Sequence, residues 1–158
     1  MKPYADTNFL ARLYLELAET DEAMKVMGPR DTRSGMVLPV MWLHRMELTN
    51  AFQLYVFLSR QGRARVTGEV AQAAHASFQS DLKQAGFLAP ASLTLSELEP
   101  QFEELSLRHT TKHGFRAYAL MHVASALLLR CDTFWTFDVR ASRLASLEGL
   151  QVLKPTAI

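Results

Sequence analysis

The stretch from residue 115 to residue 152 constrains the fold most, because its side-chain pattern alternates between helix and strand. Apolar and small residues recur at steps of three and four from Tyr118 to Leu129, which predicts a helix with one buried face. A nearly uninterrupted apolar, β-favouring run follows over 134–137, which is typical of a strand covered on both faces. Helical spacing resumes after Asp138, and a last strand is expected over 150–153. Asp138 therefore follows the carboxyl end of a buried strand, where open α/β sheets bind their ligands.

The amino terminus repeats this order of strand, acid and helix around Asp6. The two residues before the acid favour a strand, and apolar residues at helical spacing follow it over 9–17. Two further short strands are expected, at 36–38 and within 87–93, and the segments between the strands show helical patterns. Short strands that alternate with helices predict an α/β fold with a parallel sheet, here as a single domain over residues 1–158.

Capping residues and breakers predict where the remaining helices begin and end. These helices are expected over 20–27 (capped by Thr20 and closed by Gly28 and Pro29), 40–60, 66–85, and from 94 or 96 to about 112. Pro39 is expected to start the second of them, and Thr67 to cap the third. Either Thr94 or Ser96 caps the fourth, since Ser96 and Glu99 have the spacing of a capping box.

Two acids in this pattern point to a site. If the strands before Asp6 and Asp138 lie in one parallel sheet, the two carboxylates meet at one edge and repel each other. A hard divalent cation such as Mg²⁺ relieves that repulsion and prefers oxygen ligands. Glu47, on the long helix, would add a third carboxylate. Each Asp also fits a helix N-cap, a common place for Asp between a strand and a helix, and spacing alone favours capping while it leaves the metal site open.

Other polar residues give weaker signals. His109 and His113 have the spacing of a helical zinc pair, but the segment lacks the Glu of the metalloprotease motif and offers no third ligand. His122 lies in an apolar segment and is expected to be a hydrogen-bonded core or rim residue. Three arginines fit a solvated helix end better than a phosphate contact: Arg60, Arg63 and Arg65.

Composition narrows the class of protein. A net charge of +1 gives no bulk field that points to nucleic acid or acidic lipid, although it leaves a local basic patch open. One cysteine allows no internal disulfide and fits a reducing cytoplasm. The amino terminus has no signal-peptide core, and the longest apolar run, over 117–129, is too short to span a bilayer. A cytoplasmic protein without a membrane segment is therefore expected.

Four segments together resemble the PIN-domain ribonucleases, in particular the VapC-like toxins of bacterial toxin–antitoxin pairs. They read YADTNFLARLYL, LPVMWLHRMELTNAF, FRAYALMHVASALLL and FWTFDVRASRLASLEGLQVL, and they cover the chain in the family's order. The resemblance implies a three-layer α/β fold, a parallel sheet flanked by helices. It also implies a Mg²⁺- or Mn²⁺-dependent endoribonuclease, a homodimer, and a small antitoxin partner that blocks the site.

The family carries four acids, and the resemblance places three of them here. The first matches Asp6 in DTN, the second Glu47 in MELTNA and the fourth Asp138 in TFD. Asn8 and Thr136 match the polar residues that support the first and fourth acids. These acids would be the catalytic and metal-binding residues, with Asp6 and Asp138 holding the metal and Glu47 orienting the attacking water or holding a second ion.

The third family acid is missing. The family's motif reads Arg-x-x-Asp-x-x-His-x-Ala, and this chain keeps Arg116, His122 and Ala124 but has Ala119 where the Asp stands. A single clean exchange in an intact motif favours a deliberate Asp-to-Ala replacement, and a natural degenerate copy is the other origin. Either way, metal affinity and RNA cleavage are expected to be weak. The alternative function is a non-catalytic PIN-like module that binds RNA or protein.

The two long central helices predict an interface. They carry more large apolar residues than one buried face needs: Trp42, Phe52, Tyr55, Phe57, Leu58 and Phe78. Some of these are expected to be exposed on the monomer and covered by a second copy or by the antitoxin.

Overall fold

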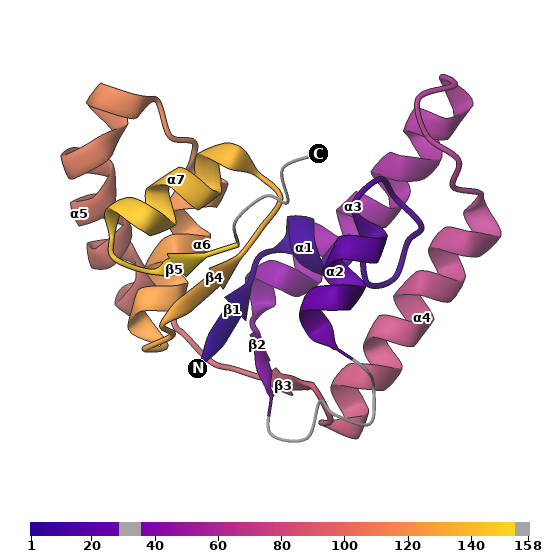
Figure 1. Cartoon of the computed structure of the whole chain (residues 1–158), viewed down its shortest axis with the longest axis horizontal. Coiled ribbons are helices and arrows are strands. Elements are labelled where there is room, and N and C mark those ends of the chain that lie inside the picture. The colour runs from indigo at the N-terminus through magenta and orange to yellow at the C-terminus, as the bar shows by residue number, and fades with distance from the viewer. Residues whose placement is uncertain (29–35, 154–158) are drawn as a thin grey trace. The chain divides into compact units, whose positions relative to one another are not determined.

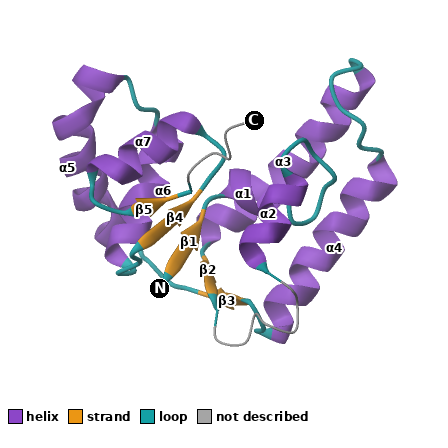
Figure 2. Cartoon of the chain, in the orientation of Figure 1, coloured by secondary structure: helices purple, strands orange, loops and turns teal. Residues whose placement is uncertain are grey.

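A computed structural model of the chain describes residues 1–28 and 36–153 as short strands that alternate with helices (Figures 1 and 2). The strands are β1 (Pro3–Ala5), β2 (Leu38–Val40), β3 (Leu88–Pro90), β4 (Thr133–Trp135) and β5 (Gln151–Val152). The helices are α1 (Thr7–Ala11), α2 (Thr20–Met27), α3 (Trp42–Arg60), α4 (Gly68–Gln84), α5 (Leu95–His113), α6 (Ala117–Leu128) and α7 (Val139–Leu147). None of these described helices is long and apolar enough to cross a membrane.

The chain divides into two compact units, each with a parallel sheet of its own. The first unit combines Met1–Asp6 with Ser92–Ile158, and the second is Thr7–Ala91. The first therefore joins the amino-terminal strand to the carboxyl-terminal half of the chain. The expectation of one domain over 1–158 stays a prediction.

The first unit is built on a three-stranded sheet with the order β1-β4-β5. Both strand pairs are parallel, and β1 and β4 are in register with Tyr4 opposite Phe134. The rings of these two residues stack with centroids 5.5 Å apart, and both are fully buried. Helix α7 contacts β4 and β5, and α6 contacts both α5 and α7. The predicted order of helix, strand, helix and strand over 115–152 is confirmed.

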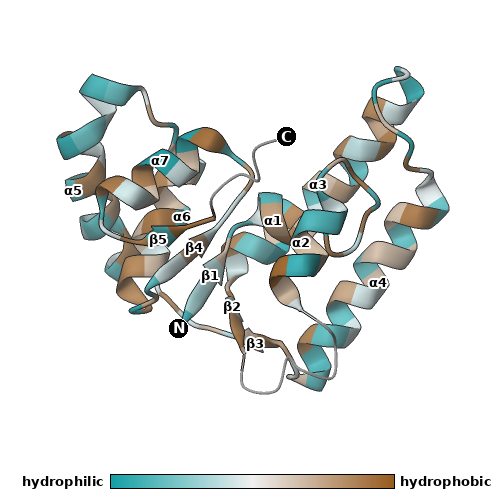
Figure 3. Cartoon of the chain, viewed as in Figure 1, coloured by the Kyte–Doolittle hydropathy of each residue, from teal (hydrophilic) through white to brown (hydrophobic). Residues whose placement is uncertain are grey.

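The second unit pairs two strands and packs two long helices together. Strands β2 and β3 are parallel, α3 packs along α4, and α1 packs on α3. Tyr14 makes edge-on ring contacts with Phe52 and Phe78, which are buried. Hydrophobic and hydrophilic residues alternate along α4, as expected for a helix with one buried face (Figure 3).

Three details differ from the expectation. Pro39 does not start a helix but lies inside β2, where Leu38 and Val40 make the flanking backbone hydrogen bonds and the missing N–H of proline is not needed. The long helix accordingly begins later, at Trp42. Tyr118 is 60% exposed and does not belong to the buried face of α6. Because this helix is apolar on nearly every side, the three–four spacing matched more than one face.

The predicted helix caps are confirmed at some helices and wrong at others. Thr67 caps α4 by accepting a hydrogen bond from the Val70 backbone N–H. At α5 the capping box is formed by Thr94 and Glu97, so the box predicted for Ser96 and Glu99 is wrong. Ser96 lies one residue inside the helix start, too late to cap it. Thr20 does not cap α2 either, since Glu19 occupies that position and the Thr20 hydroxyl donates to a backbone carbonyl in the preceding turn. Pro29 lies outside the described residues.

Candidate active site

Asp6 and Asp138 lie at one edge of the first unit's sheet, as predicted. The Asp6 backbone N–H donates to the Trp135 carbonyl over 3.1 Å, which extends the pairing of β1 and β4 by one residue. The buried Thr136 hydroxyl donates to Asp6 Oδ2 over 2.6 Å and accepts from the Asp138 backbone N–H over 2.9 Å. A single hydroxyl thus connects the two acids. Thr136 thus contacts both acids, and its supporting role stays a prediction.

Asp138 is also the N-cap of α7, so the capping interpretation is correct for this acid. Its Oδ1 accepts from the backbone N–H groups of Arg140 at 2.7 Å and Ala141 at 3.3 Å. Among the residues that the structure describes, its Oδ2 accepts no hydrogen bond, and the residue is exposed. Capping holds the carboxylate in a fixed orientation and leaves one oxygen available to a ligand. The two interpretations are compatible for Asp138.

Glu47 and Asn8 lie in the second unit. Glu47 Oε2 accepts from the Thr7 hydroxyl over 2.6 Å, which connects α3 to the start of α1. Thr7 directly follows Asp6 in the chain, and its role was missed although it is the middle residue of the DTN motif. Asn8 is half-buried in α1, where its carbonyl accepts from Arg12. The structure thus reveals a hydroxyl partner for Glu47 as well as for Asp6.

Ala119 is the third residue of α6 and is half-buried. No acid occupies the first turn of this helix. The side chain of residue 119 is therefore a methyl group at the place where the resemblance puts a carboxylate, and its position beside Asp138 stays a prediction.

The donor chemistry of these acids fits Mg²⁺ or Mn²⁺. Carboxylate oxygens are the ligands that hard divalent cations prefer, and both Asp6 and Glu47 already accept a hydroxyl hydrogen bond that orients them. Within the described ranges, no group of three or more His, Cys, Asp or Glu side chains is placed to hold a metal ion.

Comparison with known proteins decides the fold. No protein-family model matches the sequence, and no curated protein matches it. The structure resembles VapC20 of Mycobacterium tuberculosis, a sarcin-ricin loop cleaving toxin, with a TM-score of 0.62 and 18% identity over 98% of this chain and 100% of that chain. It also resembles VapBC2 of Rickettsia felis bound to a promoter DNA fragment, with a TM-score of 0.65 and 13% identity over 97% and 98% of the two chains. The chain has a VapC-like PIN-domain fold. The predicted three-layer α/β class is confirmed with it.

Two other groups of residues in this VapC-like fold are structural. The Tyr4 hydroxyl lies 2.8 Å from His122 Nδ1 in the core, which confirms His122 as a hydrogen-bonded buried residue. His109 Nε2 lies 2.5 Å from Glu148 Oε1, and Arg108 binds the same carboxylate at 2.9 and 3.1 Å. These contacts connect α5 to Glu148 at the end of α7. They give His109 a carboxylate partner.

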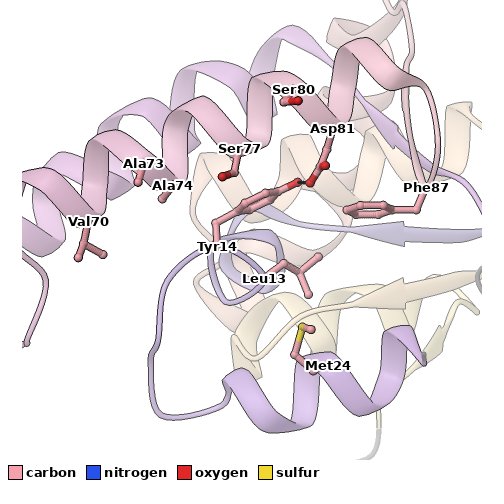
Figure 4. A pocket seen from close by; sticks show the side chains of 10 residues that line it. All are labelled: Leu13, Tyr14, Met24, Val70, Ala73, Ala74, Ser77, Ser80, Asp81 and Phe87. Carbon is pink, nitrogen blue, oxygen red and sulfur yellow. Dashed lines mark hydrogen bonds between the residues drawn. The ribbon is translucent and has the colours of Figure 1, made fainter. Parts of the chain in front are cut away.

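A separate pocket lies in the second unit between α2, α4 and the turn that follows α1 (Figure 4). It encloses about 460 Å³, and its lining is mainly apolar or small: Leu13, Tyr14, Met24, Val70, Ala73, Ala74, Ser77, Ser80, Asp81 and Phe87. The Tyr14 hydroxyl donates to Asp81 over 2.9 Å at its centre. None of the acids predicted for catalysis lines this pocket, so the candidate reaction centre is the sheet edge instead.

Proposed function

We propose that the chain is an endoribonuclease toxin of the VapC type whose activity is weakened by Ala119. The observation that carries this proposal is the hydrogen-bonded connection of Asp6, Thr136 and Asp138 at the carboxyl edge of the sheet in a VapC-like fold. VapC20, one of the two similar structures, is a sarcin-ricin loop cleaving toxin. The reaction would be hydrolysis of an RNA phosphodiester bond.

The acids would hold a divalent ion, Mg²⁺ or Mn²⁺. Asp6 and Asp138 would be its ligands, and Glu47 would orient the attacking water or bind a second ion, a role that rests on the resemblance. When bound, such an ion supplies a nucleophilic water at neutral pH and stabilises charge on the phosphate. Thr136 keeps the Asp6 carboxylate oriented through a charge-assisted hydrogen bond, and Thr7 does the same for Glu47.

Ala119 would lower activity because the cluster has one carboxylate fewer. Cleavage of RNA by the chain and by its Ala119→Asp variant, each with Mg²⁺, Mn²⁺ or EDTA, tests the proposal. The matched control is Ala117→Asp, which adds the same charge to the same first turn of α6. We expect cleavage to rise in Ala119→Asp only, and only with a divalent ion. If Ala119→Asp cleaves no RNA with any divalent metal, the enzyme proposal fails.

The same cleavage assay distinguishes the endoribonuclease from the second candidate function. A non-catalytic PIN-like module that binds RNA or protein is favoured by the methyl group at position 119, which removes one expected ligand. Such a module would bind its partner without cleavage in every variant.

The proposed partners are a small antitoxin and a second copy of the chain. The VapBC2 structure is the similar structure that motivates the antitoxin. The dimer was predicted from large apolar residues on the two long helices, and only some of these residues are exposed. Phe52 and Phe78 are buried, but Phe57 is 54% exposed on α3, together with Leu54 and Met46. Light scattering that shows a strict monomer without added partner would count against the dimer.

A cytoplasmic location completes the proposal. Cys131 is the single cysteine, and burial raises the pKa of its thiol to about 11. A thiol of this kind is protonated and inert at neutral pH. It is therefore compatible with the reducing cytoplasm.

A further inference from the structure

Charge is distributed unevenly along α5 in the first unit. Its acids lie in the first half of the helix: Glu97, Glu99, Glu103 and Glu104. Its basic residues lie in the last six positions: Arg108, His109, Lys112 and His113. Basic residues at a helix carboxyl end interact favourably with the helix dipole, so helix stability alone explains this half of the pattern.

The basic end of α5 lies close to α7. Glu148, at the end of α7, binds both Arg108 and His109, so its negative charge is compensated. The pKa of His113 is lowered, first by loss of hydration and then by the positive charges of Arg143, His109 and Lys112. Arg143 belongs to α7, so the charge of this helix acts on the end of α5, which Arg108 and His109 also connect to Glu148.

The bases on α7 are not explained by helix stability. Arg140 and Arg143 are three residues apart, which puts them on the same side of the helix, and both are exposed whereas Ala141 and Leu144 are buried. Arg140 lies in the first turn, where the positive end of the helix dipole disfavours a cation. Neither arginine forms an ion pair with a described carboxylate. A negatively charged ligand outside the chain would account for both.

The two arginines of α7 form a row that begins beside the candidate active site. Arg140, Arg143 and Lys112, all of them exposed, are called the basic surface. Arg140 donates its backbone N–H to Asp138, and Arg143 lies about 7.5 Å beyond Asp138 along the helix axis at 1.5 Å per residue. The row thus begins beside the acid proposed to act on the phosphodiester and continues away from it.

We propose that the basic surface binds consecutive phosphates of the RNA strand and guides the strand to Asp138. This inference rests on the proposed function and adds the residues that position its substrate. RNA fits the surface because exposed point charges contact phosphates without reading the bases, and because the row ends at the acid edge. The surface would supply affinity, and base preference would come from other residues.

The test measures affinity for a fluorescein-labelled oligouridylate by fluorescence anisotropy, in EDTA and over a range of salt concentrations. The variant replaces Arg140 and Arg143 by Gln, and the matched control replaces the exposed Arg63 and Arg65 of the second unit by Gln. We expect the first pair to lower affinity about tenfold and to reduce the salt slope by about 1.4, or about 0.7 for each lost phosphate contact. The control pair should stay within about twofold of the parent chain. Replacement of Arg140 and Arg143 by Lys should retain affinity, because the charge remains.

Three results would overturn the inference. Unchanged affinity in the Gln pair would do so, as would an equal loss in the control pair. Loss of binding to polyglutamate with unchanged binding to the oligouridylate would instead identify a surface for an acidic protein.

Parallel cleavage assays on Ala119→Asp separate this inference from the proposed function. If that variant cleaves RNA while the Gln pair binds normally, only the basic surface fails. If the parent and Ala119→Asp neither bind nor cleave RNA, both proposals fail.

Discussion

The two ends of strand β4 each carry an aspartate, and the two residues are used differently. Asp132 directly precedes the strand, and Asp138 follows its carboxyl end. Asp132 accepts from the Lys2 backbone N–H with both oxygens at 3.0 Å and from the Thr133 hydroxyl at 2.6 Å. Asp138 accepts with Oδ1 alone. The carboxylate at the amino end of the sheet accepts hydrogen bonds with both oxygens, whereas among the described residues the one at the carboxyl end accepts them with Oδ1 alone.

The difference follows from the direction of the strands. In a parallel sheet the strands begin at one edge and end at the other, and helices start from the carboxyl edge. Asp6, Thr136 and Asp138 collect there because β1 and β4 are neighbours that run the same way. An acid at the opposite edge has the same chemistry but contacts a backbone N–H, a neighbouring hydroxyl and the amino-terminal ammonium group. Position along the strand, and not residue type, therefore separates a candidate ligand from a structural acid.

The largest expected effect distinguishes these two acids in catalysis. In the Ala119→Asp background, Asp138→Asn should lower RNA cleavage by at least about a hundredfold, because a lost metal ligand costs several kcal/mol of transition-state stabilisation. Asp132→Asn should leave cleavage within about twofold. Asparagine caps helices as well as aspartate does, so the stability of Asp138→Asn should barely change. Equal activities of the two variants in a cleavage assay would remove the functional distinction between the ends of the strand.

The next effect concerns the hydroxyl that connects the acids. Thr136→Val leaves the buried Oδ2 of Asp6 without its 2.6 Å donor, and should lower the free energy of unfolding by about 1–3 kcal/mol. Thr136→Ser keeps the hydroxyl and serves as the control. Urea denaturation measures both. A Val variant as stable as the Ser variant would show that the hydrogen bond does not hold the carboxyl edge together.

The smallest effect is a pH dependence at the amino end. The pKa of Asp132 is lowered, first by the Thr133 hydroxyl and then by the Lys2 backbone N–H. A depressed pKa in the folded state stabilises the protein above the unfolded pKa, and this contribution disappears as the pH falls through the folded value. Asp132→Asn should thus lower the unfolding temperature at neutral pH and match the parent chain in acid. A difference between the two proteins that stays constant with pH in thermal unfolding would contradict this origin.

The sequence predicted the elements that follow from topology and missed those that depend on packing. The meeting of Asp6 and Asp138 was predictable, because alternating strands and helices imply parallel neighbours. Thr7 was missed because its hydroxyl partner, Glu47, is 40 residues away and appears only when α3 packs on α1. Tyr118 was misplaced because an apolar helix offers several faces of similar spacing. The basic surface was not predicted, because a net charge of +1 does not tell where the charges lie and because its residues come from two helices, α5 and α7.

The role of position 119 in metal binding tests the central claim most directly. Calorimetric titration of Mn²⁺ into the chain and into Ala119→Asp compares the chain with a variant that has one more carboxylate. If the carboxyl edge of the sheet is a metal centre, the added charge should raise affinity about ten- to a hundredfold, equivalent to roughly 1.4–2.8 kcal/mol. Ala117→Asp should bind Mn²⁺ like the parent chain. Equal affinities for the parent and Ala119→Asp would mean that residue 119 does not belong to the site, and would contradict the assignment of this edge as a ribonuclease centre.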